Sequence, residues 1–96
     1  MIIDFGNQAT EDVFNGLDTK QARTIPNTVW RVAVRKLDMI NAAHELKDLK
    51  SPPANRLELL KGKWSGYYSI RINDQYRIVF KWVDQNAKSV VITDYH

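Results

Sequence analysis

The fold is decided by the stretch YYSIRINDQYRIVFKW, residues 67–82. Apolar and polar side chains alternate through both of its halves, which is the period of a β-strand with one buried face. Between the halves lie Asn73, Asp74 and Gln75, a turn-forming group in which Asn and Asp are suited to left-handed backbone. The stretch therefore predicts an antiparallel hairpin with strands over residues 67–72 and 76–82.

The length of the loop determines which residues face each other across this hairpin. With a three-residue loop Arg71 lies opposite Arg77, and the apolar side chains share one face: Tyr68, Ile70, Ile72, Tyr76, Ile78 and Phe80. The other face then carries Tyr67, Ser69, Arg71, Arg77, Val79 and Lys81. A two-residue loop would pair Arg71 with Tyr76 and mix both faces, so the hydrophobic pattern favours the odd-length loop.

The polar face of the hairpin is expected to bind an anion. Like charges directly opposite each other are destabilising, and Arg71 and Arg77 form such a pair beside Lys81. Residues 1–48 carry six Lys/Arg and seven Asp/Glu, whereas residues 49–96 carry eight and four. A basic, strand-rich half is typical of a nucleic-acid or phosphate binder, although a solvated charged face gives the same pattern.

The rest of the chain predicts helices first and strands afterwards. A short strand is expected over residues 1–5, a helix over residues 8–14 capped by Asn7, and a long helix from Pro26 to about residue 46. An apolar stripe runs along the long helix at Val29, Ala33, Leu37, Ile40 and Ala43. Further strands are expected over residues 56–60 and 89–93. This order predicts an α+β fold, a small, mainly antiparallel sheet of three to five strands with both helices on one face.

Composition excludes several classes of protein. With 96 residues, 44% hydrophobic and 26% charged, the chain is expected to form one folded domain rather than a disordered segment. No apolar run approaches the roughly 20 residues of a membrane span, and the first residues do not resemble a signal peptide. There is no cysteine, and the two histidines are widely separated. We therefore expect a cytoplasmic protein without a metal site or cofactor.

Several residues inside and outside the hairpin carry chemistry that suits RNA. The chain ends in Asp94-Tyr95-His96, an acid, a phenol and an imidazole that can transfer protons, although chain ends are commonly frayed. Glu58 is open to three roles: a solvated edge residue, a structural partner of an arginine, or a general base. Trp64 and Tyr67 are candidates for stacking on bases. The basic candidates for RNA binding are Lys61, Lys63, Arg71, Lys81 and Arg56.

Such a set is sufficient in principle for RNA cleavage without a metal. The 2′-hydroxyl of RNA is an internal nucleophile, so the protein needs to supply a base, an acid and cations that stabilise the phosphorane. The sequence therefore permits a small ribonuclease of this kind. Taken alone, each lysine could equally belong to a polar loop, and each aromatic residue could equally pack in the core.

Three segments in order resemble the HigB family of toxins, within the RelE/ParE superfamily of toxin–antitoxin modules. They are NRLELLKG at residues 55–62, GYYSIRINDQYRIVF at residues 66–80, and the terminal Asp94-Tyr95-His96. The resemblance covers nearly the whole chain and implies a RelE-like fold. It also implies an endonuclease that cuts mRNA on the ribosome at the decoding site, held inactive by a HigA-like antitoxin. Such an antitoxin carries a helix-turn-helix domain, and operator DNA is bound only through it.

The resemblance also implies roles for single residues. Lys61 matches a lysine that contacts phosphate, and Arg77 matches the arginine that stabilises charge in the transition state. Asp94, Tyr95 and His96 match a terminal triplet implicated in proton transfer and RNA positioning. Several relatives have histidine where this chain has Glu58, so the role of that carboxylate is a departure from the family. Arg71 is matched less uniformly than Arg77.

Two other functions remain compatible with the sequence. A ParE-like toxin would inhibit DNA gyrase through protein contacts and would not need the terminal acid–base triplet. A non-enzymatic RNA-binding module would need only the basic face. Mapped mRNA 5′ ends would separate these from the nuclease, and codon preference and antitoxin stoichiometry cannot be read from the sequence.

Overall fold

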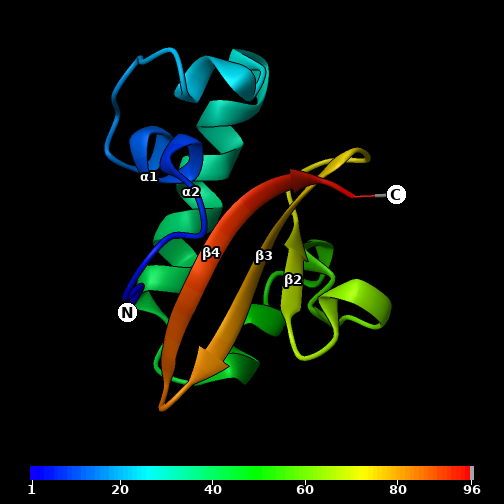
Figure 1. Cartoon of the computed structure of the whole chain (residues 1–96). Coiled ribbons are helices and arrows are strands. Elements are labelled where there is room, and N and C mark those ends of the chain that lie inside the picture. The colour runs from blue at the N-terminus through cyan, green and yellow to red at the C-terminus, as the bar shows by residue number, and fades with distance from the viewer. Residues whose placement is uncertain (96) are drawn as a thin grey trace.

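The computed structural model describes residues 1–95 and forms an α+β fold (Figure 1). The helices are α1, Gln8–Phe14, and α2, Asn27–Ala42. The strands are β1, Glu58–Leu59, β2, Tyr68–Arg71, β3, Tyr76–Val83, and β4, Asn86–Asp94. Short 3-10 helices lie at Ala22–Thr24, Leu46–Lys50, Pro53–Asn55 and Gly62–Trp64. The predicted fold class, a small sheet preceded by two helices, is confirmed.

The strands form one antiparallel sheet in the order β1-β2-β3-β4. Arg71 pairs with Arg77 and Ile70 with Ile78, so the predicted register and three-residue loop are confirmed. The loop does not use the left-handed backbone we expected of it. Instead the side-chain oxygen of Asn73 accepts hydrogen bonds from the backbone N–H groups of Gln75, at 2.8 Å, and Tyr76, at 2.7 Å.

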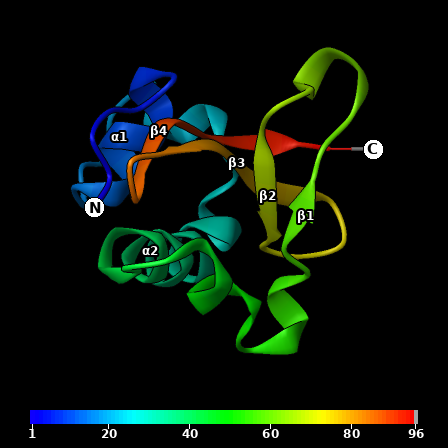
Figure 2. The ribbon, with the colours of Figure 1, turned by 90° about the horizontal axis from the view of Figure 1, so that it is seen from below.

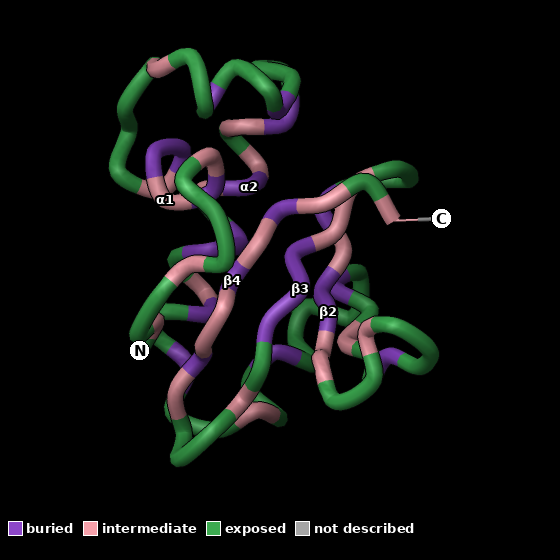
Figure 3. The backbone as a smooth tube through the Cα atoms, in the orientation of Figure 1, coloured by how far each residue is buried: buried purple, intermediate pink, exposed green. Residues whose placement is uncertain are grey.

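One face of the sheet is covered by the helices. Helix α2 packs against β3 and β4, and α1 packs against α2 and β4, while β1 lies at the opposite edge (Figure 2). The predicted stripe of α2 is buried together with the apolar face of the hairpin: Val29, Ala33, Leu37, Ile40, Ile70, Ile78 and Phe80. Figure 3 shows buried residues along α2 and the middle of β2 and β3. The apolar pattern therefore positions the hairpin with its second face turned away from the helices.

The ends of several predicted elements were wrong. Residues 1–5 form two isolated parallel bridges with β4, at Ile2 and Phe5, rather than a strand. The backbone of Ser89 has a φ of +54° and its N–H donates to the Asp4 side chain, which interrupts continuous pairing. Helix α2 ends four residues earlier than predicted because Ala43 is extended.

Two strand boundaries also differ for local reasons. The first strand of the sheet is limited to two residues because Arg56 has left-handed backbone, with φ of 47°, which cannot continue a strand. The final strand begins at Asn86 rather than residue 89 because Asp84 and Gln85, both with positive φ, close a two-residue turn. Neither helix within residues 1–95 has the length and apolar character that a bilayer crossing requires.

Candidate active site

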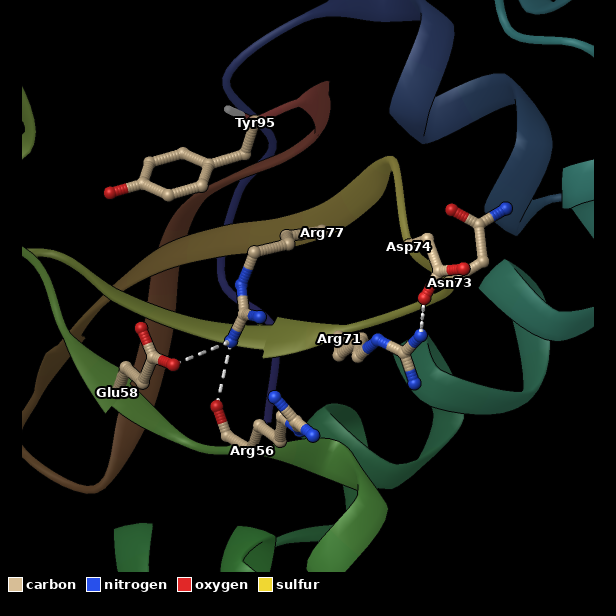
Figure 4. A pocket seen from close by; sticks show the side chains of 7 residues that line it. All are labelled: Arg56, Glu58, Arg71, Asn73, Asp74, Arg77 and Tyr95. Atoms are coloured by element: carbon tan, nitrogen blue, oxygen red, sulfur yellow. Dashed lines mark hydrogen bonds and ion pairs between the residues drawn. The ribbon is translucent and has the colours of Figure 1, made fainter.

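The face of the hairpin that the helices do not cover brings two guanidinium groups together (Figure 4). Arg71 and Arg77 are direct cross-strand partners, an arrangement that by itself is unfavourable. Each arginine has an acidic neighbour that reduces the repulsion. Arg71 forms an ion pair with Asp74 in the hairpin loop, and Glu58 lies 4.0 Å from Nη2 of Arg77.

Arg77 is fixed from two sides by neutral acceptors. Its Nε donates to the Ser69 hydroxyl at 2.8 Å, and its Nη2 donates to the Arg56 carbonyl at 2.7 Å. Its side chain is only 11% exposed. Burial lowers the pKa of Arg77 from its ordinary value; Glu58 and Tyr95 oppose this shift, and Arg71 and Arg56 reinforce it. Arg77 is thus a held, partly desolvated cation, the kind of group that stabilises developing negative charge most strongly.

These side chains line a cavity of about 310 Å³, which we call the arginine cavity: Arg56, Glu58, Arg71, Asn73, Asp74, Arg77 and Tyr95. Three of its residues are arginines, and the planar guanidinium group is well matched to phosphate oxygens. The cavity has two carboxylates: Asp74 forms an ion pair with Arg71, and Glu58 lies beside Arg77. The cavity can therefore hold a phosphodiester next to a carboxylate and a phenol.

A second hollow, of about 220 Å³, lies on the other side of Tyr95. We call it the lysine hollow; its lining residues are Lys61, Lys63, Trp64, Thr93, Asp94 and Tyr95. Gly62 has a φ of +70° and begins the 3-10 helix that carries Lys63 and Trp64. Such a hollow, with two cations and an indole, suits a nucleotide adjoining the one in the arginine cavity.

The final strand brings Asp94 and Tyr95 beside the hairpin loop and the two hollows. Asp94 lies opposite Tyr76, and the backbone N–H of Tyr95 donates to the Gln75 carbonyl at 3.0 Å. The Asp94 carboxylate accepts a hydrogen bond from the Gln75 side chain at 2.8 Å. Tyr95 lines both hollows and so separates them. The predicted role of His96 lies outside the described residues.

The structure does not bring every candidate together. Lys81 lies farther along β3, with Nζ 5.1 Å from the centre of the Tyr67 ring, and lines neither hollow. Tyr67 also contacts Trp64 edge-on, with ring centres 5.1 Å apart, so the two predicted stacking residues contact each other. Within residues 1–95 no cluster of three or more His, Cys, Asp or Glu side chains is arranged to hold a metal ion.

Two residues of this face were not identified from the sequence. Ser69 is fully buried and orients Arg77, although we predicted only that it shares the polar face. Its position was the available signal, because it is a small hydroxyl diagonal to Arg77 across the hairpin. Asp74 was assigned to the loop alone, yet it lines the arginine cavity and pairs with Arg71.

The family model of the RelE-like toxin of the type II toxin-antitoxin system HigB matches residues 3–96. This chain belongs to the HigB-like toxin family. Toxin HigB-1 of Vibrio cholerae is 40% identical to it over 84 residues, which cover 88% of this chain and 86% of the relative. An uncharacterized protein of Haemophilus influenzae is 46% identical over 68 residues, 71% of this chain and 67% of that protein.

The fold of this HigB-like toxin is also similar to solved toxin structures. The chain aligns with the YoeB–YefM complex of Staphylococcus aureus with a TM-score of 0.52 and 28% identity, covering 96% of this chain and 92% of the other. A heterotetrameric YoeB–YefM toxin–antitoxin complex gives a TM-score of 0.53 with the same coverage and identity. The chain is thus a type II toxin with a RelE-like fold.

Proposed function

We propose that this HigB-like toxin is an endoribonuclease that cleaves mRNA on the ribosome and so inhibits translation. The observation that carries the proposal is the arginine cavity, where Arg77 is held by Ser69 and Arg56 beside Glu58 and Tyr95. A phosphate bound in the arginine cavity would meet a preorganised cation, which would need little reorganisation as negative charge develops.

In the proposed reaction the 2′-hydroxyl of one nucleotide attacks the adjoining phosphorus. Its proton passes to a base, the bond from phosphorus to the 5′-oxygen breaks, and that oxygen receives a proton from an acid. The products are a 2′,3′-cyclic phosphate and a 5′-hydroxyl. We assign charge stabilisation to Arg77, with Arg71 and Arg56 binding the same phosphate.

Proton transfer is assigned to Glu58 and to the terminal Asp94 and His96. Glu58 lies within 4.0 Å of Arg77 Nη2, so a carboxylate is present in the cavity despite the departure from the family's histidine. Tyr95 is assigned to position the scissile nucleotide, because it lies between the two hollows. Lys61 and Lys63 in the lysine hollow would bind the neighbouring phosphates.

The experiment is to map mRNA 5′ ends after expression of the toxin and of two variants. We expect codon-phased cuts for the wild type and about 100- to 1,000-fold fewer for Arg77→Ala, since a single preorganised donor of this kind contributes on that scale. Lys81→Ala should change the cuts by less than about threefold, because Lys81 lines neither hollow. Circular dichroism and thermal unfolding establish that each variant is folded. Full cleavage by folded Arg77→Ala would contradict the proposal, as would DNA damage without mRNA cuts, the result expected of a gyrase inhibitor.

We further infer that the partner is a HigA-like helix-turn-helix antitoxin that binds operator DNA for the complex. The solved YoeB structures similar to this chain contain the antitoxin YefM, which supports an antitoxin partner here. Co-expression with the neighbouring small open reading frame should yield a complex that purifies together and has no cleavage activity. A toxin that remains fully active beside that product would contradict this assignment.

A further inference from the structure

The side-chain amide of Asn55, the residue before Arg56 of the arginine cavity, is buried. Asn55 is fully buried, and its Nδ2 donates to the carbonyls of Leu49, at 3.1 Å, and Ser51, at 3.4 Å. Its Oδ1 accepts a hydrogen bond from Nζ of Lys36 on helix α2. The amide therefore ties the segment that enters β1 to helix α2.

Lys36 is an unusual partner for this amide because it is itself buried, with 5% of its surface exposed. Burying an ammonium group is costly, and such groups are normally paired with a carboxylate. Here the partner is the neutral Asn55 oxygen, and burial lowers the pKa of Lys36, with Arg35 and Arg71 adding to the shift. An apolar side chain at position 36 would leave the buried Asn55 oxygen without this donor, so the ammonium of Lys36 serves to hold that amide in place.

The link from this pair to the cavity passes through one strained residue. Arg56 follows Asn55 and has left-handed backbone, with φ of 47° and ψ of 57°, which is uncommon for a residue other than glycine. Its N–H donates to the Pro53 carbonyl at 3.0 Å, and its own carbonyl accepts from Nη2 of Arg77. That conformation also leaves the Arg56 guanidinium in the arginine cavity. The direction of the Arg56 carbonyl therefore determines one of the two anchors of Arg77.

We propose that Lys36 and Asn55 are positioning residues of the nuclease site, which fix Arg56 in its left-handed conformation and through its carbonyl hold the Arg77 guanidinium. The proposal rests on the proposed function for its consequence in catalysis, but the positioning itself is a property of the free toxin. Neither residue lines the arginine cavity, so their effect reaches the phosphate through Arg56, whose side chain lines the cavity, and through Arg77, which the Arg56 carbonyl holds.

The first test is made on the free toxin, by NMR. Lys36→Met keeps the buried chain length and removes the ammonium, and Arg35→Met, at an exposed neighbour on α2, is the matched control. We expect hydrogen exchange at Arg77 Nε–H to be at least about 10-fold faster in Lys36→Met, because a displaced Arg56 carbonyl no longer holds Nη2 and the loosened guanidinium leaves Ser69 more often. The rate should be unchanged in Arg35→Met. Unchanged exchange in folded Lys36→Met would overturn the proposal.

A second pair of variants covers the case in which Lys36→Met does not fold. Arg56→Gly accepts left-handed backbone and should keep the slow exchange of Arg77 Nε–H, whereas the β-branched Arg56→Val opposes that backbone and should lose it. Both variants lack the guanidinium, so any difference between them arises from the backbone. Equal exchange rates in the two folded proteins would overturn the proposal.

The catalytic consequence is measured as cleavage of mRNA on programmed ribosomes. In Lys36→Met we expect kcat to fall about 100-fold, the scale of a misplaced catalytic group, with KM changed by less than about threefold. A rise in KM at constant kcat would overturn the positioning role. If the wild type itself does not cleave, the proposed function fails, and the exchange rates still decide whether Lys36 and Asn55 hold Arg77.

Discussion

The two faces of strand β3 are stabilised in different ways. On the covered face, Ile78 and Phe80 are fully buried against α2 and neighbouring strands. On the open face, Arg77 is only partly buried and is fixed by directed hydrogen bonds to Ser69 and Arg56. Many interchangeable apolar contacts stabilise the first face, whereas a few specific polar contacts arrange the second. The first should therefore determine whether the protein folds, and the second whether it cleaves.

The open face is less uniform than a solvated basic surface. Ser69 and Val79 are fully buried on it, and the register shifts between Val79 and Lys81. Lys81 lies beyond that irregularity on β3 and lines neither hollow. The proposed active site thus occupies the end of this face near the hairpin loop and the carboxyl end of β4.

Among these substitutions, the largest loss of stability is expected on the covered face. Phe80→Ala should lower the free energy of unfolding by about 3–5 kcal/mol, because it removes a fully buried ring that contacts Tyr68 and Trp82. Urea unfolding followed by tryptophan fluorescence measures the change. The remaining folded protein should cleave normally per molecule. A fully stable but inactive Phe80→Ala protein would invalidate the division between the two faces.

A smaller effect, confined to the open face, is expected from Lys61→Gln combined with Lys63→Gln. Each lysine that contacts a phosphate contributes about 0.7 to the slope of log affinity against log salt for single-stranded RNA. The double variant should lose about 1.4 from that slope while unfolding at the same urea concentration as the wild type. Lys20→Gln with Lys50→Gln, at exposed lysines outside both hollows, is the control and should leave the slope unchanged.

The smallest effect is expected at acid pH on the helical side. The Asp12 carboxylate accepts hydrogen bonds from Thr19 at 2.6 Å and Gln8 at 2.8 Å, and these lower its pKa below the usual 3.8. A lowered pKa in the folded state contributes stability above pH 3.8 that is lost as the pH falls through the folded value. Asp12→Asn should therefore be less stable than the wild type at pH 7, with a difference that shrinks at low pH.

Thermal unfolding across this pH range tests the prediction, and cleavage per folded molecule at pH 7 should be unaffected. A difference in stability that stayed constant down to low pH would show that the Asp12 carboxylate does not contribute in this way.

The helices and strands whose apolar residues repeat periodically could be predicted from the sequence. Alternation in residues 67–82 and a stripe along α2 reflect burial of one face, which is a property of many residues together. The element ends could not be predicted in the same way, because they depend on single backbone conformations such as those of Ala43, Arg56 and Ser89.

The candidate site was predictable in its charges but not in its anchoring. The pairing of Arg71 with Arg77 follows from register, but the carbonyl of Arg56 becomes an acceptor for Arg77 only through its left-handed backbone. Lys36 was also missed, although it stands three residues after Ala33 and four before Ile40 and therefore on the buried side of α2. A charged residue at an apolar position of a helical stripe was the signal that pointed to it.

The most direct test of the central claim is cleavage of an mRNA in which one nucleotide, the one preceding the mapped cut, lacks its 2′-hydroxyl. The account predicts that the wild-type toxin cuts the all-ribose mRNA on the ribosome and leaves a 2′,3′-cyclic phosphate, and that the single deoxy substitution abolishes that cut. Equal cleavage of the two messages would contradict attack by the 2′-hydroxyl at the arginine cavity.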